Sequence, residues 1–404
     1  MSVKQPRPVG RTWALPAWLA AAALMLTGCG GGGATTDSGQ AQSTLSPAAA
    51  LGEKIFKDAS LSASGKMSCA SCHDPSAAHA QTNALAVQFG GPALDVAGLR
   101  AVPSLRYLST TPAFFFSKDG KPNGGFNHDG KADTLLAQAI RPFMAAHEMA
   151  NGDARTVIDK LARTSYAADF RKAFGSNVFN DPDAAFLAVR HALQRYQLED
   201  SAEFAPFSSK YDAFLAGQAR LNDAELRGLA LFNNPAKGNC ASCHPSARGS
   251  DGSAPLFTDF TFDNLGVPRN TEIPATADPT YFDLGLCQVD RPELASRTEL
   301  CGAFKVPTLR NVATRKAFFH NGRFKTLREA LRFYVTRDTQ PELWYPVVNG
   351  VVDKFNDLPP AYRANVNTTE VPYNRKPGDA PALSDAEIDD VIAFLGTLND
   401  GYKP

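Results

Sequence analysis

Two stretches of the sequence share one pattern: Cys69-Ala70-Ser71-Cys72-His73 and Cys240-Ala241-Ser242-Cys243-His244. The pattern Cys-x-x-Cys-His is the attachment signature of c-type haem. Two thiols at this spacing on one turn of chain can reach the two vinyl groups at one edge of a porphyrin, and the imidazole of the next residue then lies beneath the ring. We therefore expect two covalently attached haem c groups, with His73 and His244 as the proximal iron ligands.

Two other kinds of site use cysteines at this spacing, namely zinc sites and redox-active dithiols. A zinc site needs further Cys or His ligands nearby, and His79 is the only candidate close to the first motif. The chain has only seven cysteines and seven histidines among 404 residues. Two chance matches to the pattern are therefore rare, and the haem interpretation is favoured.

The sequence around the two motifs forms a loose internal repeat, with LGEKIF at 51–56 before the first and RGLALF at 227–232 before the second. Capping residues predict helix starts at Ser46-Pro47, at Asn222-Asp223 and at Ser384-Asp385-Ala386-Glu387. Pro, Gly and Asn are scattered between the helical stretches, and no strand alternation is sustained. We expect a mostly α protein of two cytochrome c-like haem domains with long loops, at residues 45–220 and 221–404.

The N-terminus has the features of an export signal. Its positive residues are Lys4, Arg7 and Arg11. They precede an uncharged, mostly apolar run at 13–27 that is too short to span a bilayer comfortably. Leu26-Thr27-Gly28-Cys29 resembles the bacterial lipobox, in which the cysteine is lipidated; ordinary cleavage that discards Cys29 is the alternative.

We therefore predict a lipoprotein signal peptide at residues 1–29 and a flexible tether at 30–44. The protein is then periplasmic and anchored to the outer membrane through Cys29, with no other membrane contact.

The charge balance and the remaining cysteines fit an exported protein. The 41 basic residues equal the 41 acidic ones, so the chain has no electrostatic footprint for nucleic acid. Cys287 and Cys301 belong to neither motif. In an oxidising compartment such a remaining pair favours a disulfide over two free thiols.

An electron carrier fills both axial positions of each iron, whereas a peroxidase leaves one position open. Met149 is the last methionine in the chain, so the usual methionine ligand is not available to the second haem. Candidate second ligands for the first haem are His79, Met144, Met149, His128 and His147. His79 follows His73 by only six residues, which is too few to wrap around a haem. We expect at least one haem to have an open face.

From about residue 45 to 400 the chain resembles the bacterial dihaem cytochrome c peroxidase and MauG family. The resemblance is carried by the haem motifs, FKVPTLRNV at 304–312, FHNG at 319–322 and TLREA at 326–330, and by the spaced series Asp129-Gly130, Gln138, Pro142 and Glu148-Met149.

In that family a glutamate in an x-Glu-Met segment lies over the open haem and works on peroxide, and Glu148 matches this position. A carboxylate can take a proton from one peroxide oxygen and return it to the departing one. Burial would raise its pKa toward the working range. Gln138 and Pro142 match pocket residues of the family. The alternative for Glu148 is a surface helix carboxylate beside His147.

The chain departs from the peroxidases of the family at two haem ligands. A distal histidine is expected sixteen residues after His73, where this chain has Phe89. The resemblance to MauG then implies a first haem that is open without reductive activation. The methionine that ligates the second haem aligns with Tyr334, as in MauG, and a tyrosine ligand favours ferric and higher states. A core aromatic role for Tyr334 and ligation by His320 are the alternatives.

Two further positions differ from the peroxidases and from MauG alike. The tryptophan between the haems aligns with His128, which either bridges the haems by hydrogen bonding or fills space as a polar residue. Residues expected at the inter-haem calcium site are replaced by Ala101, Arg315 and Ala317. We hypothesise that the calcium site is lost and that the Arg315 guanidinium replaces the ion.

The resemblance implies an enzyme that reduces hydrogen peroxide at the N-terminal haem and shares the oxidising equivalents with the C-terminal haem. Its electron donor would be a small cytochrome c or a cupredoxin. The alternatives are a MauG-like oxidase that modifies a side chain, such as tryptophan, of a partner protein, and a non-catalytic dihaem electron-transfer cytochrome.

Overall fold

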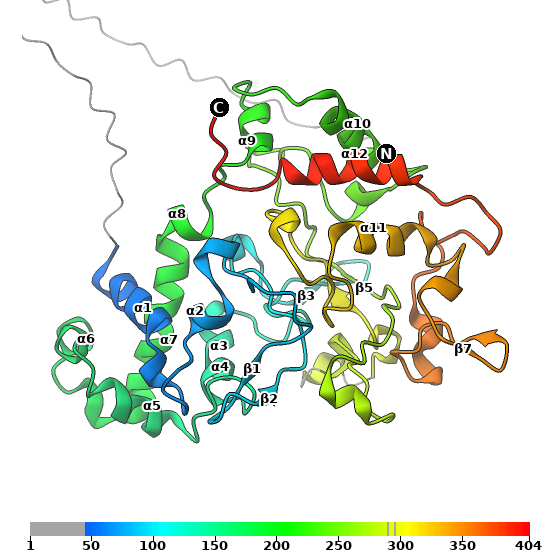
Figure 1. Ribbon diagram of the computed structural model, residues 1–404. Coiled ribbons are helices and arrows are strands. Elements are labelled where there is room, and N and C mark those ends of the chain that lie inside the picture. The colour runs from blue at the N-terminus through cyan, green and yellow to red at the C-terminus, as the bar shows by residue number, and fades with distance from the viewer. Residues whose placement is uncertain (1–44, 289–290, 295) are drawn as a thin grey trace, which may run out of the picture. The chain divides into compact units, whose positions relative to one another are not determined.

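The computed structural model describes residues 45–288, 291–294 and 296–404 (Figure 1). The predicted signal peptide, the tether and Cys29 lie outside the described residues. The described residues belong to one compact unit. None of the described helices combines the length and the apolar character that crossing a bilayer requires.

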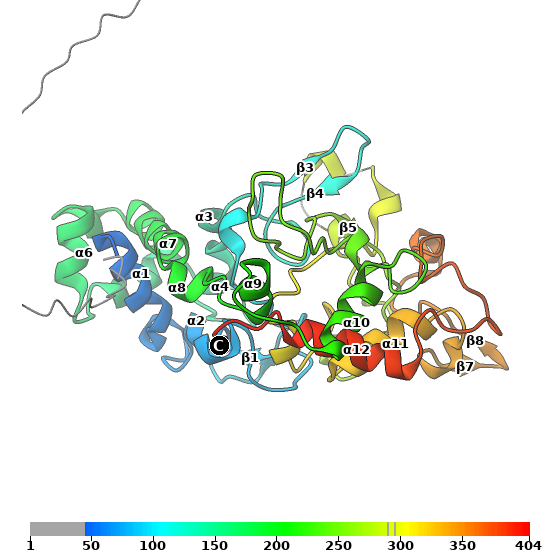
Figure 2. The ribbon, with the colours of Figure 1, turned by 90° about the horizontal axis from the view of Figure 1, so that it is seen from above.

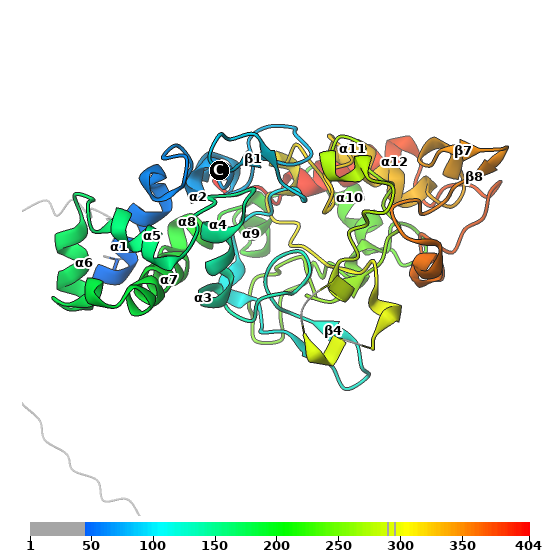
Figure 3. The same ribbon diagram turned by 90° about the horizontal axis from the view of Figure 1, so that it is seen from below.

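The described part of the chain is mostly helical, as predicted. Its α-helices are α1 (Pro47–Lys57), α2 (Cys69–Cys72), α3 (Leu135–Gln138), α4 (Ile140–Met144), α5 (Ala154–Leu161), α6 (Ala167–Phe174), α7 (Pro182–Glu199), α8 (Ser201–Phe204), α9 (Lys210–Leu215), α10 (Asp223–Asn233), α11 (Leu327–Thr336) and α12 (Asp385–Gly396). Long irregular segments connect them, and Figure 3 shows how much of the chain these segments make up.

The strands are short and pair only in antiparallel twos. They are β1 (Phe89–Gly90) with β2 (Val96–Ala97), β3 (Phe115–Phe116) with β4 (Pro122–Asn123), β5 (Phe262–Asp263) with β6 (Phe304–Lys305), and β7 (Val347–Val348) with β8 (Val351–Val352). The sequence showed no sustained alternation of apolar and polar residues, and the described residues accordingly form no extended sheet.

The predicted helix starts are confirmed. Ser46 caps α1, and its Oγ accepts a hydrogen bond from the Ala49 amide at 3.2 Å. Asn222 caps α10 and Ser384 caps α12, each in a capping box with the glutamate three residues later. These caps satisfy amide groups that the first turn of a helix leaves without partners.

The internal repeat corresponds to two similar helix crossings, α1 against α7 and α10 against α12. Figures 1 and 2 show α10 and α12 side by side. A glycine stands at each crossing because the backbones nearly touch there. A Cβ on Gly52 would lie 2.0 Å from the Ala192 carbonyl oxygen, and one on Gly228 would lie 1.9 Å from that of Asp390.

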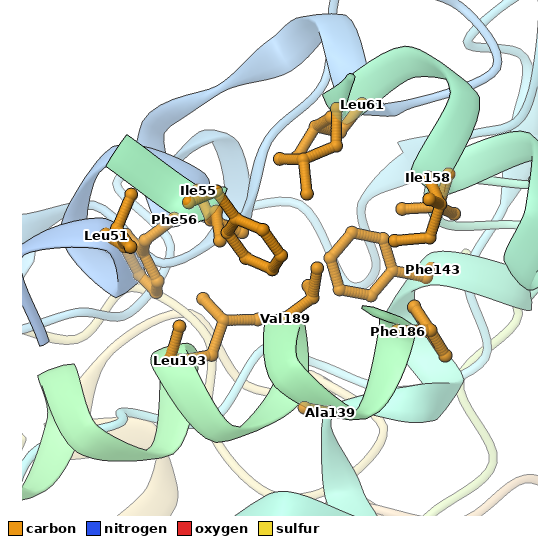
Figure 4. Packing of buried hydrophobic residues seen from close by; sticks show 14 of the residues in the cluster. Leu51, Ile55, Phe56, Leu61, Ala139, Phe143, Ile158, Phe186, Val189 and Leu193 are labelled. Atoms are coloured by element: carbon orange, nitrogen blue, oxygen red, sulfur yellow. The ribbon is translucent and has the colours of Figure 1, made fainter. Parts of the chain in front are cut away.

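Each pair of helices covers its own hydrophobic core. In the N-terminal half, Ile55, Phe56, Phe143 and Val189 are among the buried side chains that pack together (Figure 4). A second cluster includes Phe232, Phe257, Phe333 and Phe394. Tyr211 of α9 also belongs to the second cluster, although it precedes residue 220. The division of the chain at that residue stays a prediction.

The predicted disulfide is present, because Cys287 and Cys301 are bonded to each other. It closes a loop that packs on the segment before α3. Arg291 in this loop donates to the Gly130 carbonyl at 2.8 Å and pairs with Asp133 at 2.6 Å. The disulfide loop therefore supports the segment that carries His128 and Asp129.

Candidate active site

Both Cys-x-x-Cys-His motifs line a single cavity of about 720 Å³ between the two cores. The cavity is walled mainly by apolar side chains, together with a smaller set of polar ones. Its lining includes Cys69, Cys72, His73, Cys240, Cys243 and His244. The fold thus brings together two motifs that lie far apart in the sequence.

The two motifs hold their histidines in the same way. His73 follows α2, and His244 follows a short turn at Cys240–Ser242. The His73 Nδ1 lies 3.1 Å from the His79 carbonyl oxygen, and the His244 Nδ1 lies 2.7 Å from that of Phe257. When Nδ1 donates its hydrogen, Nε2 keeps a free lone pair, which is the tautomer that a metal-binding imidazole needs.

Burial shifts the titration of these groups in directions that favour a haem site. It lowers the pKa of His73 to about 4 and also lowers that of His244, so both imidazoles are neutral near pH 7. It raises the pKa of Cys69 to about 12 and that of Cys72 to about 11.

The second pair of thiols behaves similarly, because burial raises the pKa of Cys240 to about 12 and that of Cys243 to about 11. Redox-active dithiols have lowered pKa values, so these thiols do not resemble them. Within the described ranges, no group of three or more His, Cys, Asp or Glu side chains could hold a metal ion, so the zinc interpretation lacks a ligand set. The donor set fits two thioether-bound haems.

Glu148 lies on the same cavity, as do Gln138 at the end of α3 and Pro142 in α4. The Glu148 side chain exposes 37% of its surface, and its Oε1 lies 3.7 Å from the His147 Nε2. Its backbone is fixed on both sides, because its amide donates to the Ala145 carbonyl at 2.9 Å and its carbonyl accepts from Gly91 at 2.9 Å. The loop therefore holds the carboxylate at the cavity wall.

The environment of Glu148 raises the pKa of its carboxyl group. Burial is the main cause, and the Arg141 guanidinium opposes it. A carboxylate whose pKa lies closer to neutrality is a better proton acceptor and donor near physiological pH. This is the property that general acid–base work on peroxide requires.

The candidate second ligands of the first haem separate into two groups. His128, His147 and Met149 line the cavity, whereas His79 and Met144 do not. His79 is buried, and its Nε2 lies 3.1 Å from a carboxylate oxygen of Glu203. Its imidazole is therefore already engaged elsewhere. Phe89 does not line the cavity, and 42% of its surface is exposed.

Tyr334 projects from α11 into the part of the cavity near the second motif. Its ring is half-buried and contacts those of Phe319 and Tyr373, with centroids 5.5 and 6.0 Å away. Burial is the main cause that raises the pKa of its phenol above the usual range, and the nearby Asp263 carboxylate adds to the shift. Ligation of the second haem by Tyr334 stays a prediction.

His128 and His320 are connected through the backbone of Ala101. The His128 Nε2 lies 2.9 Å from the Ala101 carbonyl oxygen, and the Ala101 amide donates to the His320 carbonyl at 2.7 Å. The His320 ring stacks on Phe304 at 3.6 Å, and its Nε2 is buried without a partner in the described part of the chain. Burial lowers the pKa of His128 to about 4 and that of His320 to about 3. Both side chains are therefore neutral.

The two halves of the chain are also tied by a buried ion cluster beside these histidines. Arg100 donates two hydrogen bonds to Asp283, at 2.6 and 2.7 Å, and a third to Asp129 at 2.7 Å. Asp129 belongs to the series that resembles the family, and the structure gives it this structural partner. Paired buried charges of this kind are costly to break.

Arg315 lies at the cavity wall between the motifs. Its Nη2 donates to the Val102 carbonyl at 2.8 Å, and no carboxylate lies within salt-bridge distance of it in the described part of the chain. Burial lowers the pKa of its guanidinium to about 10, which still leaves it charged at neutral pH. The Arg315 guanidinium therefore faces a backbone carbonyl, and its replacement of a calcium ion stays a prediction.

Tyr373 and Lys305 are among the titratable cavity residues that sequence inspection did not single out. Tyr373 is buried beside Tyr334, with the Arg337 guanidinium 4.4 Å from its ring centroid. Lys305 is the other, and burial lowers its pKa to about 8. Lys305 lies within the motif FKVPTLRNV at 304–312. A basic residue between apolar neighbours could therefore have marked it as a candidate cavity residue. Nothing in the sequence around Tyr373 distinguishes it from a core aromatic.

Comparison with known proteins gives consistent matches. The family model described as di-haem cytochrome c peroxidase matches residues 46–220. The methylamine utilization protein MauG of Paracoccus denitrificans is 34% identical over 373 residues, which cover 88% of this chain and 89% of that protein. The cytochrome c551 peroxidase of Nitrosomonas europaea is 28% identical over 288 residues, or 70% of this chain and 71% of that one.

Among solved structures, the diheme peroxidase BthA from Burkholderia thailandensis matches with a TM-score of 0.80 and 44% identity. The match covers 87% of this chain and 86% of that one.

Proposed function

The chain belongs to the di-haem cytochrome c peroxidase family, a group of oxidoreductases that act on peroxide, and we propose that it reduces hydrogen peroxide at the haem of its N-terminal half. The family implies two c-type haems. Covalently held at Cys69 and Cys72 with His73 beneath it, the first haem would supply the coordination position and the electrons for reducing the peroxide bond. The observation that carries the proposal is Glu148 on the same cavity as His73.

The side chains around this haem have separate tasks. The Glu148 carboxylate accepts a proton from one peroxide oxygen and returns it to the departing oxygen, which leaves as water. Gln138 offers an amide that can hydrogen-bond to the peroxide, and Pro142 shapes the wall. Two electrons and two protons convert each peroxide into two waters. The His73 Nε2 stays unprotonated because Nδ1 carries the hydrogen.

The test is turnover by the holo-protein with hydrogen peroxide and a reduced small cytochrome c or cupredoxin. We expect peroxide-dependent oxidation of the donor, with two electrons consumed per peroxide. Absence of any turnover, in protein that retains both haems, contradicts the proposal. Adding peroxide to the fully ferric protein in a stopped-flow instrument should also change the Soret band rapidly, whereas a pure electron carrier would not respond.

The pH dependence of the reaction should follow Glu148. The carboxylate is the active form, so kcat/KM for peroxide should fall as the pH drops through the Glu148 pKa. The Arg141 guanidinium opposes the upward shift of that pKa. Replacing Arg141 by alanine should therefore raise the pKa further and move the acidic limb of the profile to higher pH.

Arg155, an arginine on α5 that does not line the cavity, provides the control, because Arg155→Ala should leave the profile unchanged. A limb that moves to lower pH in Arg141→Ala contradicts the assignment of Glu148 as the proton acceptor.

We propose that His244 and Tyr334 would hold the iron of the second haem. Tyr334 lines the same cavity as Cys240 and Cys243 and packs, like Cys240, against the second hydrophobic core. An anionic phenolate would stabilise the oxidised iron and help this haem to hold an oxidising equivalent.

A second candidate function is peroxide-driven oxidation of a side chain on a partner protein. The 34% identity to MauG and the tyrosine at position 334 favour it. Mass spectrometry of a small exported protein encoded beside this chain, after incubation with the holo-enzyme and peroxide, should then reveal an oxidised residue such as tryptophan.

We also propose that Arg315 replaces the calcium ion. Elemental analysis after mild chelation should find no stoichiometric calcium. Arg315→Ala would leave the Val102 carbonyl without its donor and should lower the free energy of unfolding by about 1–3 kcal/mol. The exposed neighbour provides the control, since Lys316→Ala should change it by less than about 0.5 kcal/mol. Retained calcium contradicts this proposal.

For the protein's location we propose the periplasm, with a lipid anchor at Cys29. The export features of residues 1–29 support this proposal. Metabolic labelling with a palmitate analogue, compared between the native chain and Cys29→Ser, tests it.

A further inference from the structure

The carbonyl groups that accept from the two proximal imidazoles belong to residues in the same unusual conformation. His79 has φ 54° and Phe257 has φ 54°, both in the left-handed region that residues other than glycine seldom adopt. Such a conformation persists where the surroundings hold the residue in place. The His79 carbonyl also accepts from the Leu105 amide at 3.1 Å and the Phe257 carbonyl from the Leu309 amide at 3.3 Å, so backbone contacts and the packing of the side chain together place the acceptor oxygen.

The two side chains are held by different means. Phe257 is fully buried and lies edge-on to Tyr211 and Phe232, with centroids 5.5 and 6.1 Å away. The Arg310 guanidinium lies 6.0 Å from its ring centroid, and the phenyl ring has no atom that could form a hydrogen bond like that of His79. The His79 ring is also fully buried, but a polar contact fixes it, because its Nε2 lies 3.1 Å from the Glu203 carboxylate.

Two aromatic side chains also pack against the His79 ring. Its ring stacks on Phe204 at 4.3 Å with an interplanar angle of 26°, and it meets the Phe56 ring edge-on at 5.7 Å. The Nδ1 atom of His79 is buried with no partner among the described residues, so Glu203 is the one polar group that orients the ring. Phe204 and Glu203 both belong to α8.

Glu203 is itself firmly placed. Its amide donates to the Asp200 carboxylate at 3.2 Å, and its carbonyl accepts from Arg106 Nε at 2.9 Å. The Glu203 carboxylate is thus presented to His79 from a fixed backbone, although 42% of the Glu203 side chain is exposed.

Backbone hydrogen bonds in the segment between His73 and His79 connect the position of His79 to that of the haem ligand. The His79 amide donates to the Asp74 carbonyl at 2.8 Å, and the Asp74 amide donates to the Ala80 carbonyl at 3.0 Å. These bonds close the segment into a tight loop whose far end is His79. The His79 carbonyl then points back at His73 Nδ1, 3.1 Å away.

We infer that His79, held by Glu203 and Phe204, is a positioning residue that sets the hydrogen bond to the proximal imidazole of the first haem. A stronger bond at Nδ1 makes Nε2 a better donor to iron and so stabilises the ferric state. The inference rests on the proposed function only in taking His73 as the iron ligand. The second haem has no polar equivalent of this contact, because Phe257 takes the place of His79.

The experiment compares midpoint potentials of the two haems in the holo-protein by spectroelectrochemical titration, without peroxide. His79→Phe keeps the stacked ring and removes the contact with Glu203. We expect the potential of the first haem to rise and the iron–histidine stretching frequency in its resonance Raman spectrum to fall, with the second haem unchanged. Glu203→Gln should stay close to the native values, because its amide oxygen still accepts from Nε2.

Unchanged potentials in His79→Phe, or equal shifts of both haems, would overturn the inference. If His79→Phe loses the first haem, Glu203→Leu supplies the test, because His79 then stays stacked on Phe204 and loses only its acceptor. A rise of the first potential is again expected, and no change overturns the inference. Because no peroxide is used, this result is independent of whether Glu148 proves to be catalytic.

Discussion

Glu148→Gln is expected to lower kcat/KM for hydrogen peroxide by about 10²- to 10⁴-fold, the range that general acid–base catalysis contributes. Glutamine has nearly the same shape as glutamate but cannot take up a proton near neutral pH. The Glu148 backbone contacts to Ala145 and Gly91 do not involve the side chain, so the loop should keep its place. Steady-state kinetics with the same electron donor measure the effect.

Two controls separate a loss of catalysis from a loss of structure. Both haems should remain attached, which a pyridine haemochrome assay checks. Glu53→Gln, which changes a glutamate of α1 that does not line the cavity, should have native kinetics. If the Glu148→Gln enzyme keeps more than about a tenth of the native kcat/KM, Glu148 is not the catalytic base but a surface carboxylate. His147 is then the nearest alternative base.

Tyr334→Phe is expected to produce the second large effect, this time on the second haem. Removal of the phenol oxygen should abolish the low-spin EPR signal of that haem in the ferric protein and leave the high-spin signal of the first unchanged. Because axial ligands set haem potentials over a range of about 0.8 V, the potential of the second haem should rise by roughly 0.1 V or more.

The matched control is Tyr373→Phe, which removes a phenol from the same cavity at a ring separation of 6.0 Å. It should leave the low-spin signal in place. If Tyr334→Phe has a native EPR spectrum and His320→Asn loses the low-spin signal, His320 is the ligand and Tyr334 is a packing residue beside Phe333.

Local patterns predicted the local structure well. The caps at Ser46, Asn222 and Ser384 are short-range hydrogen bonds between residues three apart, so the sequence contains all of their determinants. The haem motifs are equally local. The disulfide was predictable because only two cysteines remained once the haem motifs and the lipobox cysteine Cys29 were assigned.

Contacts between distant residues were not predictable. The short distance of His79 from His73 along the chain argued against it as an iron ligand, but its actual partner, Glu203, lies 124 residues away. Which wall Tyr373 lines depends on how the long segment between α11 and α12 folds back. No periodicity of the sequence encodes such placement, since it results from packing of the whole molecule.

The shared cavity also constrains how the protein is made. Its walls come from both halves, and the Arg100 cluster and the bond from Ala101 to His320 close across it. A rigid macrocycle would meet these contacts if it entered after they had formed. We therefore expect covalent attachment of the porphyrins to precede closure of the fold, and a chain that closes first to remain without its cofactors.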